Sequence, residues 1–97
     1  MAARTTIVAG NWKMNLDREQ GRALAKAVVD RRRDAAATEL VLCPPAPYLE
    51  AVGAALTGSD VSLGGQNAHD KAGGAFTGEV APAMLVDLGC RYVILGH

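Results

Sequence analysis

The sequence carries no excess of charge of either sign. Lysine and arginine together number 10, as do aspartate and glutamate, so the formal net charge at neutral pH is zero. A chain without an overall positive field has no electrostatic means of concentrating a polyanion around itself. We therefore expect no nucleic-acid partner.

Long hydrophobic runs are also missing. No segment approaches the roughly 20 consecutive apolar residues that a helix needs to cross a bilayer. The apolar run after Arg4 is too short for the hydrophobic part of a secretory signal. We therefore expect no membrane partner and a cytoplasmic location.

Cysteine is scarce as well, because Cys43 and Cys90 are the only two. Their separation matches neither a C-x-x-C motif nor metal-ligand spacing, which favours two reduced structural thiols over a buried disulfide. No metal is expected.

The signatures of nucleotide binding are absent too. Asn11-Trp12-Lys13 follows the first apolar run, where a dinucleotide-binding module would carry G-x-G-x-x-G. The glycine-rich stretch 73–78 lacks the Lys-Ser/Thr pair of a phosphate loop, and Glu79 after it would repel an anion. A doubly wound nucleotide-binding module is therefore disfavoured.

What the sequence does contain is the composition of one globular domain over residues 1–97, with 49% hydrophobic and 21% charged residues. Short apolar runs typical of buried strands alternate with segments of helical periodicity. The predicted strands are 7–9, 40–43, 61–67 and 92–97, and the predicted helices begin near Asp17, Pro47 and Pro82. This order, β-α-β-α-β-α-β, predicts an α/β fold with parallel strands and right-handed crossovers.

Two of the predicted helices carry finer expectations. Asp17 and Gln20 have the spacing of a capping box, which predicts the start of the first helix. The arginines at 31–33 are expected in the last turns of that helix, where cations complement the helix dipole. The helix after Pro82 is expected to turn Met84, Leu85 and Leu88 toward the core.

Polar and ionisable residues follow the predicted strands. In an extended strand Asn11 and Lys13 would point to one side and Trp12 to the other. Lys13 and His97 would then lie at the same edge of a parallel sheet, where ligands bind. Taken alone, Lys13 fits a snorkelling surface lysine and His97 fits a structural histidine. Together they form a candidate site.

The connection 68–79 is long for a compact domain and rich in glycine, which is typical of functional or mobile loops. Phe76 lies within it. On chemistry alone, an exposed Phe76 fits insertion into another surface and a hydrophobic latch on its own domain equally well.

Three motifs, taken in order, resemble the triosephosphate isomerase family. They are A-G-N-W-K-M-N at 9–15, G-A-F-T-G-E at 74–79 and Y-V-I-L-G-H at 92–97, and they are similar to the family's first-strand, third-loop and fourth-strand motifs. The similarity spans nearly the whole chain. It implies the amino-terminal half of a (β/α)8 TIM barrel, whose active site lies at the carboxyl face of the strands.

The resemblance also implies an activity. This is the interconversion of dihydroxyacetone phosphate and D-glyceraldehyde 3-phosphate through an enediolate, in glycolysis and gluconeogenesis, with neither cofactor nor metal. By analogy with the family, Lys13 would neutralise the charge of the phosphate and of the enediolate. Asn11 would donate a hydrogen bond to the substrate, and a neutral His97 would polarise the carbonyl.

The resemblance to the family also implies a function for the glycine-rich loop. Thr77, with Phe76 beside it, would reach into a neighbouring subunit and brace the substrate-binding pair there. This implies a homodimer formed through the 73–79 loop.

One departure from the family is large. Only four strands are predicted, and the family's glutamate base, closing lid and phosphate-gripping loops match nothing in this sequence. Four parallel strands cannot close a barrel, so the first and fourth would have open edges and one apolar face would be uncovered. We expect a fragment of a longer isomerase that is inactive alone. The alternative is a non-catalytic half-barrel that acts through assembly with a second half or a second copy.

Overall fold

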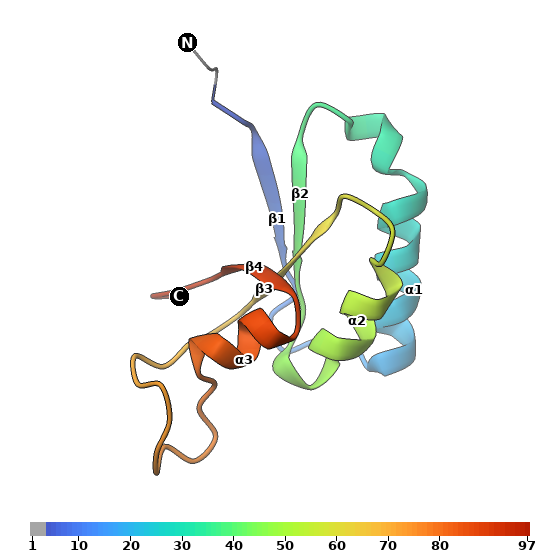
Figure 1. The fold of residues 1–97 in the computed structure, drawn as a ribbon. Coiled ribbons are helices and arrows are strands. Elements are labelled where there is room, and N and C mark those ends of the chain that lie inside the picture. The colour runs from blue at the N-terminus through green and yellow to red at the C-terminus, as the bar shows by residue number, and fades with distance from the viewer. Residues whose placement is uncertain (1–3) are drawn as a thin grey trace.

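The structure, a computed structural model, describes residues 4–97. These residues form a sheet of four parallel strands in the order β1-β2-β3-β4, with an α-helix in each connection (Figure 1). The strands are β1 (Ile7–Asn11), β2 (Glu39–Cys43), β3 (Ser62–Gly65) and β4 (Cys90–Val93). The helices are α1 (Arg18–Asp30), α2 (Leu49–Ala55) and α3 (Pro82–Asp87), with short 3-10 helices η1 (Arg32–Ala35) and η2 (Ala46–Tyr48). The predicted β-α-β-α-β-α-β order is confirmed, and it is that of the first half of a TIM barrel.

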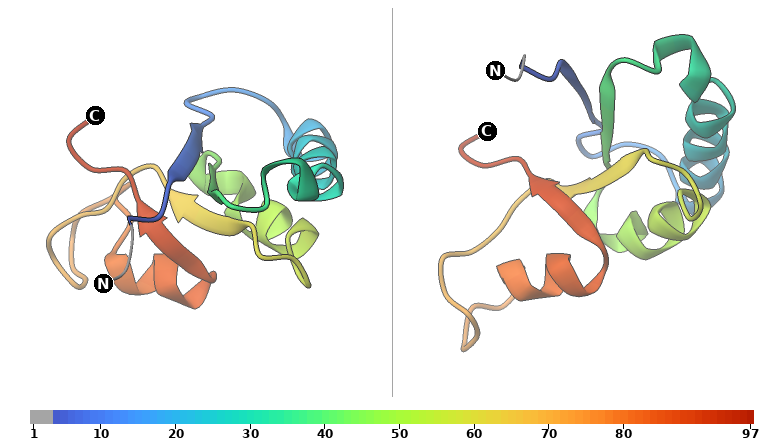
Figure 2. Two further views of the ribbon diagram at one scale, coloured as in Figure 1. Left: turned by 90° about the horizontal axis from the view of Figure 1, so that it is seen from above. Right: turned by 45° about the horizontal axis from the view of Figure 1, so that its top comes forward.

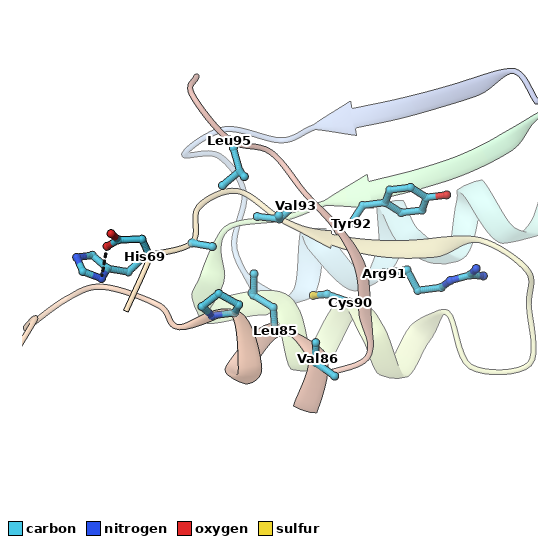
Figure 3. Close-up of a pocket in the computed structure, with 11 residues that line it drawn as sticks. His69, Leu85, Val86, Cys90, Arg91, Tyr92, Val93 and Leu95 are labelled. Atoms are coloured by element: carbon cyan, nitrogen blue, oxygen red, sulfur yellow. Dashed lines mark ion pairs between the residues drawn. The ribbon is translucent and has the colours of Figure 1, made fainter. Parts of the chain in front are cut away.

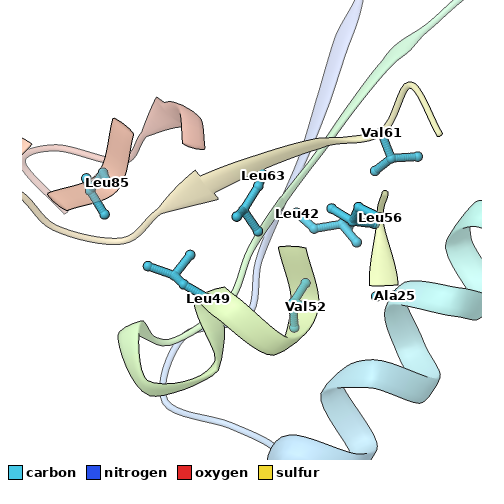
Figure 4. Packing of buried hydrophobic residues seen from close by; sticks show 8 residues of the cluster. All are labelled: Ala25, Leu42, Leu49, Val52, Leu56, Val61, Leu63 and Leu85. Atoms are coloured by element: carbon cyan, nitrogen blue, oxygen red, sulfur yellow. The ribbon is translucent and has the colours of Figure 1, made fainter. Parts of the chain in front are cut away.

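The hydrophobic core lies between the sheet and the helices, which wrap the outer side of the curved sheet (Figure 2). Figure 4 shows side chains of β2 and β3 meeting those of the helices there. Leu49 and Val52 of α2 are 2% and 0% exposed, and burying each such side chain contributes about 1.5–3 kcal/mol. The buried hydrophobic residues of the core are Ala25, Leu42, Leu49, Val52, Leu56, Val61, Leu63 and Leu85.

Helix α1 begins at the predicted capping box. The Asp17 carboxylate accepts a hydrogen bond from the backbone N–H of Gln20 at 2.8 Å, and the Gln20 side chain accepts one from the backbone N–H of Asp17 at 3.2 Å. The buried side of α1 is made of small residues, Gly21 and Ala25. They let the helix approach closely, because a Cβ at Gly21 would already lie 3.5 Å from Val52.

The prediction for the arginines at 31–33 was wrong, because α1 ends at Asp30. Arg31 is its C-cap residue, and the next residues tighten into η1. The Arg32 guanidinium turns to Asp60, with nitrogen–oxygen distances of 2.8 and 3.2 Å. The chain therefore leaves the helix after Asp30, and Arg32 pairs with Asp60 in the turn before β3.

Three further expectations are corrected. Met84 is 54% exposed and does not face the core, because α3 is only six residues long and buries Leu85 alone. Strand β3 is confined to Ser62–Gly65, and β4 begins at Cys90 and ends at Val93, so each is shorter than its apolar run. Within residues 4–97, β4 is an edge of the sheet, and no strand pairs with it on its far side.

An irregularity between β3 and β4 sets which way the side chains of β4 face. Leu63 pairs with Cys90 and Gly64 pairs with Tyr92, so one residue of β4 is skipped. Cys90 therefore packs on the outer core, whereas Tyr92 crosses the inner side and donates its hydroxyl hydrogen to the Glu39 carboxylate. This hydrogen bond is the main reason why the pKa of Tyr92 is raised.

The two edge strands leave apolar side chains uncovered, as expected for an open sheet. Ile7 and Val8 of β1 are 49% and 55% exposed, and Leu95 beyond β4 is 65% exposed. No helix within residues 4–97 combines the length and the apolar character needed to cross a membrane.

Candidate functional site

The loop between β1 and α1 is the most strained part of the described backbone. Lys13 and Leu16, with φ of 56° and 75°, are the only non-glycine residues among 4–97 with positive φ. A left-handed conformation costs roughly 1–2 kcal/mol for a residue with a Cβ. Such strain persists only where surrounding contacts hold it, and it is concentrated at functional sites.

Strand β1 ends before Lys13. The alternation of side chains along a strand therefore cannot place Lys13 on the same side as Asn11. β1 stops at Asn11, and Lys13 is left-handed rather than extended. A hydrogen bond brings the two residues together instead: the Lys13 backbone N–H donates to Asn11 Oδ1 at 3.0 Å. This contact involves the Lys13 backbone, so the expectation that the two side chains point to the same side stays a prediction.

Gln66 holds the other side of the Lys13 peptide. Its Nε2 donates to the Lys13 carbonyl oxygen at 2.8 Å and to the Cys43 carbonyl oxygen at 2.8 Å. The Cys43 carbonyl also accepts the backbone N–H of Trp12 at 3.1 Å. The ends of β1, β2 and β3 are thereby tied together at one point. Sequence reasoning missed Gln66, whose only signal was an amide directly after Gly65, at the carboxyl end of an apolar run.

The side chains of Asn11 and Lys13 provide complementary donors. Because Asn11 Oδ1 already accepts the Lys13 N–H, the group that Asn11 has left for a ligand is its NH2, which only donates. The Lys13 side chain is exposed and makes no hydrogen bond or ion pair within the described part of the chain. An amide donor beside an unpaired ammonium suits an anionic oxygen ligand.

His97 follows the carboxyl end of β4. The backbone N–H of Ile94 donates to the Gly65 carbonyl at 2.9 Å, which keeps the chain beside the end of β3. Gly96 then takes a left-handed turn, with φ of 71°, and His97 is exposed. Within residues 4–97 no hydrogen bond or ion pair joins the His97 ring to Lys13 or Asn11.

Phe76 and Thr77 lie in the loop between β3 and α3, which projects away from the sheet (Figure 1). Thr77 is exposed, and Phe76 is 43% exposed with its ring against His69. No hydrogen bond in the described residues links Thr77 to Asn11 or Lys13 of the same chain.

A cavity of about 450 Å³ lies elsewhere, between α3, β4 and the start of the long loop (Figure 3). Its lining is mainly apolar, with Leu85, Val86, Val93 and Leu95 among the lining side chains, and neither Asn11 nor Lys13 contributes to it. Such a lining suits hydrophobic packing rather than a phosphate.

The two cysteines are free thiols. Burial raises the pKa of both, and the neighbouring Cys90 raises that of Cys43 further. A raised thiol pKa disfavours the nucleophilic thiolate. Among residues 4–97, no three His, Cys, Asp or Glu side chains gather as metal ligands would.

Comparison with known proteins agrees with the three motifs. The sequence model of the triosephosphate isomerase family matches residues 6–97. The triosephosphate isomerases of Rhodopirellula baltica and Symbiobacterium thermophilum are each 53% identical to the chain, over 98% and 97% of its length. That of Carboxydothermus hydrogenoformans is 46% identical over 97%. The chain spans 37–38% of the length of these relatives. A match over nearly every residue, together with the half-barrel topology, makes this chain a member of the triosephosphate isomerase family.

Proposed function

We propose that residues 1–97 supply the substrate-binding lysine and asparagine of a triosephosphate isomerase. The reaction interconverts dihydroxyacetone phosphate and D-glyceraldehyde 3-phosphate through an enediolate, in glycolysis and gluconeogenesis in the cytoplasm. The observation that carries the proposal is the strained Lys13, held by Asn11 on one side and Gln66 on the other. Strain fixed by hydrogen bonds on both sides is what a preorganised catalytic group requires.

The chemistry assigned to each residue follows from its charge and its free hydrogen-bonding groups. Proton abstraction next to the substrate carbonyl places negative charge on an oxygen, and the Lys13 ammonium stabilises that charge together with the phosphate. The free NH2 of Asn11 donates to a substrate oxygen. His97, as a neutral imidazole, donates to the carbonyl oxygen as it becomes anionic. None of these steps calls for a cofactor or a metal.

The 73–79 loop completes the arrangement in a homodimer. Thr77 of one copy would brace Asn11 and Lys13 of the other, with Phe76 covered by the same contact. The exposure of both loop residues, away from their own Lys13, supports this assignment.

A complete catalyst also requires a general base, which contributes about 10²–10⁴-fold in rate. The family's glutamate matches no position in residues 1–97. The proposed activity therefore belongs to the full-length protein, by which we mean a polypeptide of the relatives' length that carries these residues. A polypeptide limited to residues 1–97 is expected to be inactive.

The test is the Lys13→Met substitution in the full-length protein. Methionine fills a similar volume without the cation, so kcat/KM should fall by at least about 100-fold while the circular dichroism spectrum is retained. Lys26→Met, on the exposed side of α1, is the matched control and should leave turnover unchanged. Near-normal turnover of Lys13→Met would refute the assignment.

A second candidate function, a non-catalytic half-barrel that acts by assembly, is favoured by one observation. The edge strands expose Ile7, Val8 and Leu95, which a second half or a second copy would cover. Residues 1–97 alone should then sediment as a dimer or larger species. A monodisperse monomer with a sharp near-ultraviolet circular dichroism spectrum would exclude this candidate.

A further inference from the structure

The loop between β3 and α3 is organised around one side chain that has no part in the proposed chemistry, His69. Its backbone N–H donates to the Val80 carbonyl at 2.7 Å and so closes the base of the loop. Its ring Nδ1 accepts the backbone N–H of Lys71 at 3.0 Å. The His69 side chain is 22% exposed, although residues 70–79 are all exposed.

The same imidazole packs against Phe76. The two ring centroids are 4.3 Å apart and the planes are tilted by 32°, which is within the range of favourable aromatic pairs. The Phe76 ring also lies over Gly74, where φ is 118° and a Cβ would come within 3.2 Å of it. Phe76 is therefore fixed by its own loop, with 43% of its surface left exposed.

Thr77 lies in a turn that begins at Phe76. The backbone N–H of Glu79 donates to the Phe76 carbonyl at 3.0 Å and closes a tight turn. Thr77 and Gly78 are the central residues of this turn, and Gly78 has the positive φ, 87°, that the turn needs. The His69 ring thus contacts the first residue of the turn that contains Thr77.

The hydrogen bond from Lys71 requires one protonation state of His69. With Nδ1 as acceptor, a neutral ring carries its hydrogen on Nε2. Asp70 Oδ1 lies 3.3 Å from the same Nδ1 (Figure 3), so a proton there would pair with Asp70 and leave the Lys71 N–H without its acceptor. Of the other charged groups, Glu79 lines a small cavity beside His69 together with Lys71, and Arg91 lies at the far end of the larger cavity.

We propose that His69 is a positioning residue, which in its neutral form holds the loop 68–80 in the shape that presents Thr77 to a second copy of this chain. The inference rests on the proposed role of the loop in a homodimer. It adds that the ring serves the loop twice, as the acceptor for the Lys71 N–H and as the surface against which Phe76 packs.

Two substitutions separate the two contacts of the ring. His69→Phe retains an aromatic ring against Phe76 but removes the acceptor for the Lys71 N–H. His69→Asn retains an acceptor oxygen two residues before Lys71, as in an Asx turn, but removes the ring. Lys71→Ala is the control, since Lys71 contributes only its backbone N–H to these contacts.

The variants are compared in the full-length protein by hydrogen exchange of peptides covering 68–80 and by sedimentation over a dilution series. His69→Phe should speed exchange at Lys71 and raise the dimer dissociation constant about fivefold. His69→Asn should restore protection at Lys71 while exchange at the 76–79 turn stays fast.

Unchanged loop exchange in His69→Phe would overturn the proposal. Faster exchange with wild-type dimerisation and turnover would also overturn it, because His69 would then order only its own loop. Failure of the proposed function looks different: the wild-type protein itself would lack isomerase activity or remain monomeric, before any variant is compared.

Discussion

The side-chain nitrogen of Gln66 lies 2.8 Å from the carbonyl oxygen of Lys13, across 53 residues of sequence. The same nitrogen donates to the carbonyl of Cys43, the last residue of β2. Since Asn11 holds the Lys13 N–H, the peptide groups on both sides of the Lys13 Cα are fixed. The backbone from which the Lys13 side chain projects is therefore held by an amide that directly follows β3.

Gln66→Leu should weaken catalysis without touching a substrate group. Leucine keeps a similar volume, but the Lys13 carbonyl loses the Gln66 donor and the Cys43 carbonyl keeps only the Trp12 N–H, at a cost of about 0.5–1.5 kcal/mol for each lost hydrogen bond. We expect kcat/KM of the full-length protein to fall roughly 10- to 100-fold. Gln20→Leu, which removes only the capping-box contact, serves as the control and should lower thermal stability slightly while turnover is retained. Equal turnover of Gln66→Leu and the wild type would show that Lys13 holds its place without this contact.

The strain at Lys13 can be measured separately from its charge. Lys13→Gly and Lys13→Ala both lack the ammonium group and should both be inactive. Glycine tolerates a φ of 56° without a Cβ clash. The free energy of unfolding, measured by chemical denaturation, should therefore be larger for Lys13→Gly than for Lys13→Ala by roughly 1 kcal/mol. At an ordinary helical or extended position the order would be the reverse. An alanine variant more stable than the glycine variant would therefore contradict a left-handed Lys13.

Gly64 is a packing requirement of the inner side of the sheet. A Cβ there would lie 2.7 Å from Cys43 Sγ and 3.2 Å from a methyl carbon of Val41. Gly64→Ala should destabilise the protein by about 1–3 kcal/mol through overpacking. Adding Cys43→Ala removes the nearest atom and should recover part of this loss, so the double-mutant cycle has a stabilising interaction term. Chemical denaturation of the wild type, the two single variants and the double variant measures this interaction term. Additive losses of stability would show that Cys43 is not what a Cβ at position 64 clashes with.

The ion pair between Arg32 and Asp60 should stabilise the folded protein near neutral pH and stop doing so in acid. The hydrogen bond from Arg32 is the main cause that lowers the pKa of Asp60. A carboxylate with a lowered pKa in the folded state stabilises the protein above its unfolded pKa, near 4, and this contribution disappears as the pH falls through the folded value. Between about pH 5 and about pH 3, wild type should lose more stability than Asp60→Asn. Asp87→Asn, on the exposed face of α3, should behave as wild type. A parallel loss in wild type and Asp60→Asn would show that the pair does not form in solution.

Periodicity and capping predict much of this fold because they act locally. The alternation of apolar runs with helical segments predicts the parallel sheet, and the spacing of Asp17 and Gln20 predicts the start of α1. The same local patterns gave a wrong prediction where the outcome depended on the length of a helix. An α3 of six residues has room to bury Leu85 but not Met84, and periodicity does not reveal where a helix stops.

The candidate site was only partly predictable for a different reason. Asn11 and Lys13 were identifiable because polar residues directly follow a buried strand. The left-handed φ of Lys13 and the bridging role of Gln66 arise from contacts between distant segments, so no local pattern contains them. The skipped residue in β4, which sends Tyr92 to the inner side, likewise depends on pairing with Gly64.

The in-register ladder between β1 and β2 runs without interruption from Ile7 opposite Glu39 to Asn11 opposite Cys43. The ladder, and not the length of the connecting chain, aligns the two strand ends at which Asn11 and the Cys43 carbonyl lie. The exposed turn at 36–37 can therefore gain or lose residues while Asn11 and the Cys43 carbonyl keep their positions. It is a natural place to insert an epitope or a fluorescent label, and a place where diverging lineages can differ in length at no cost to the chemistry.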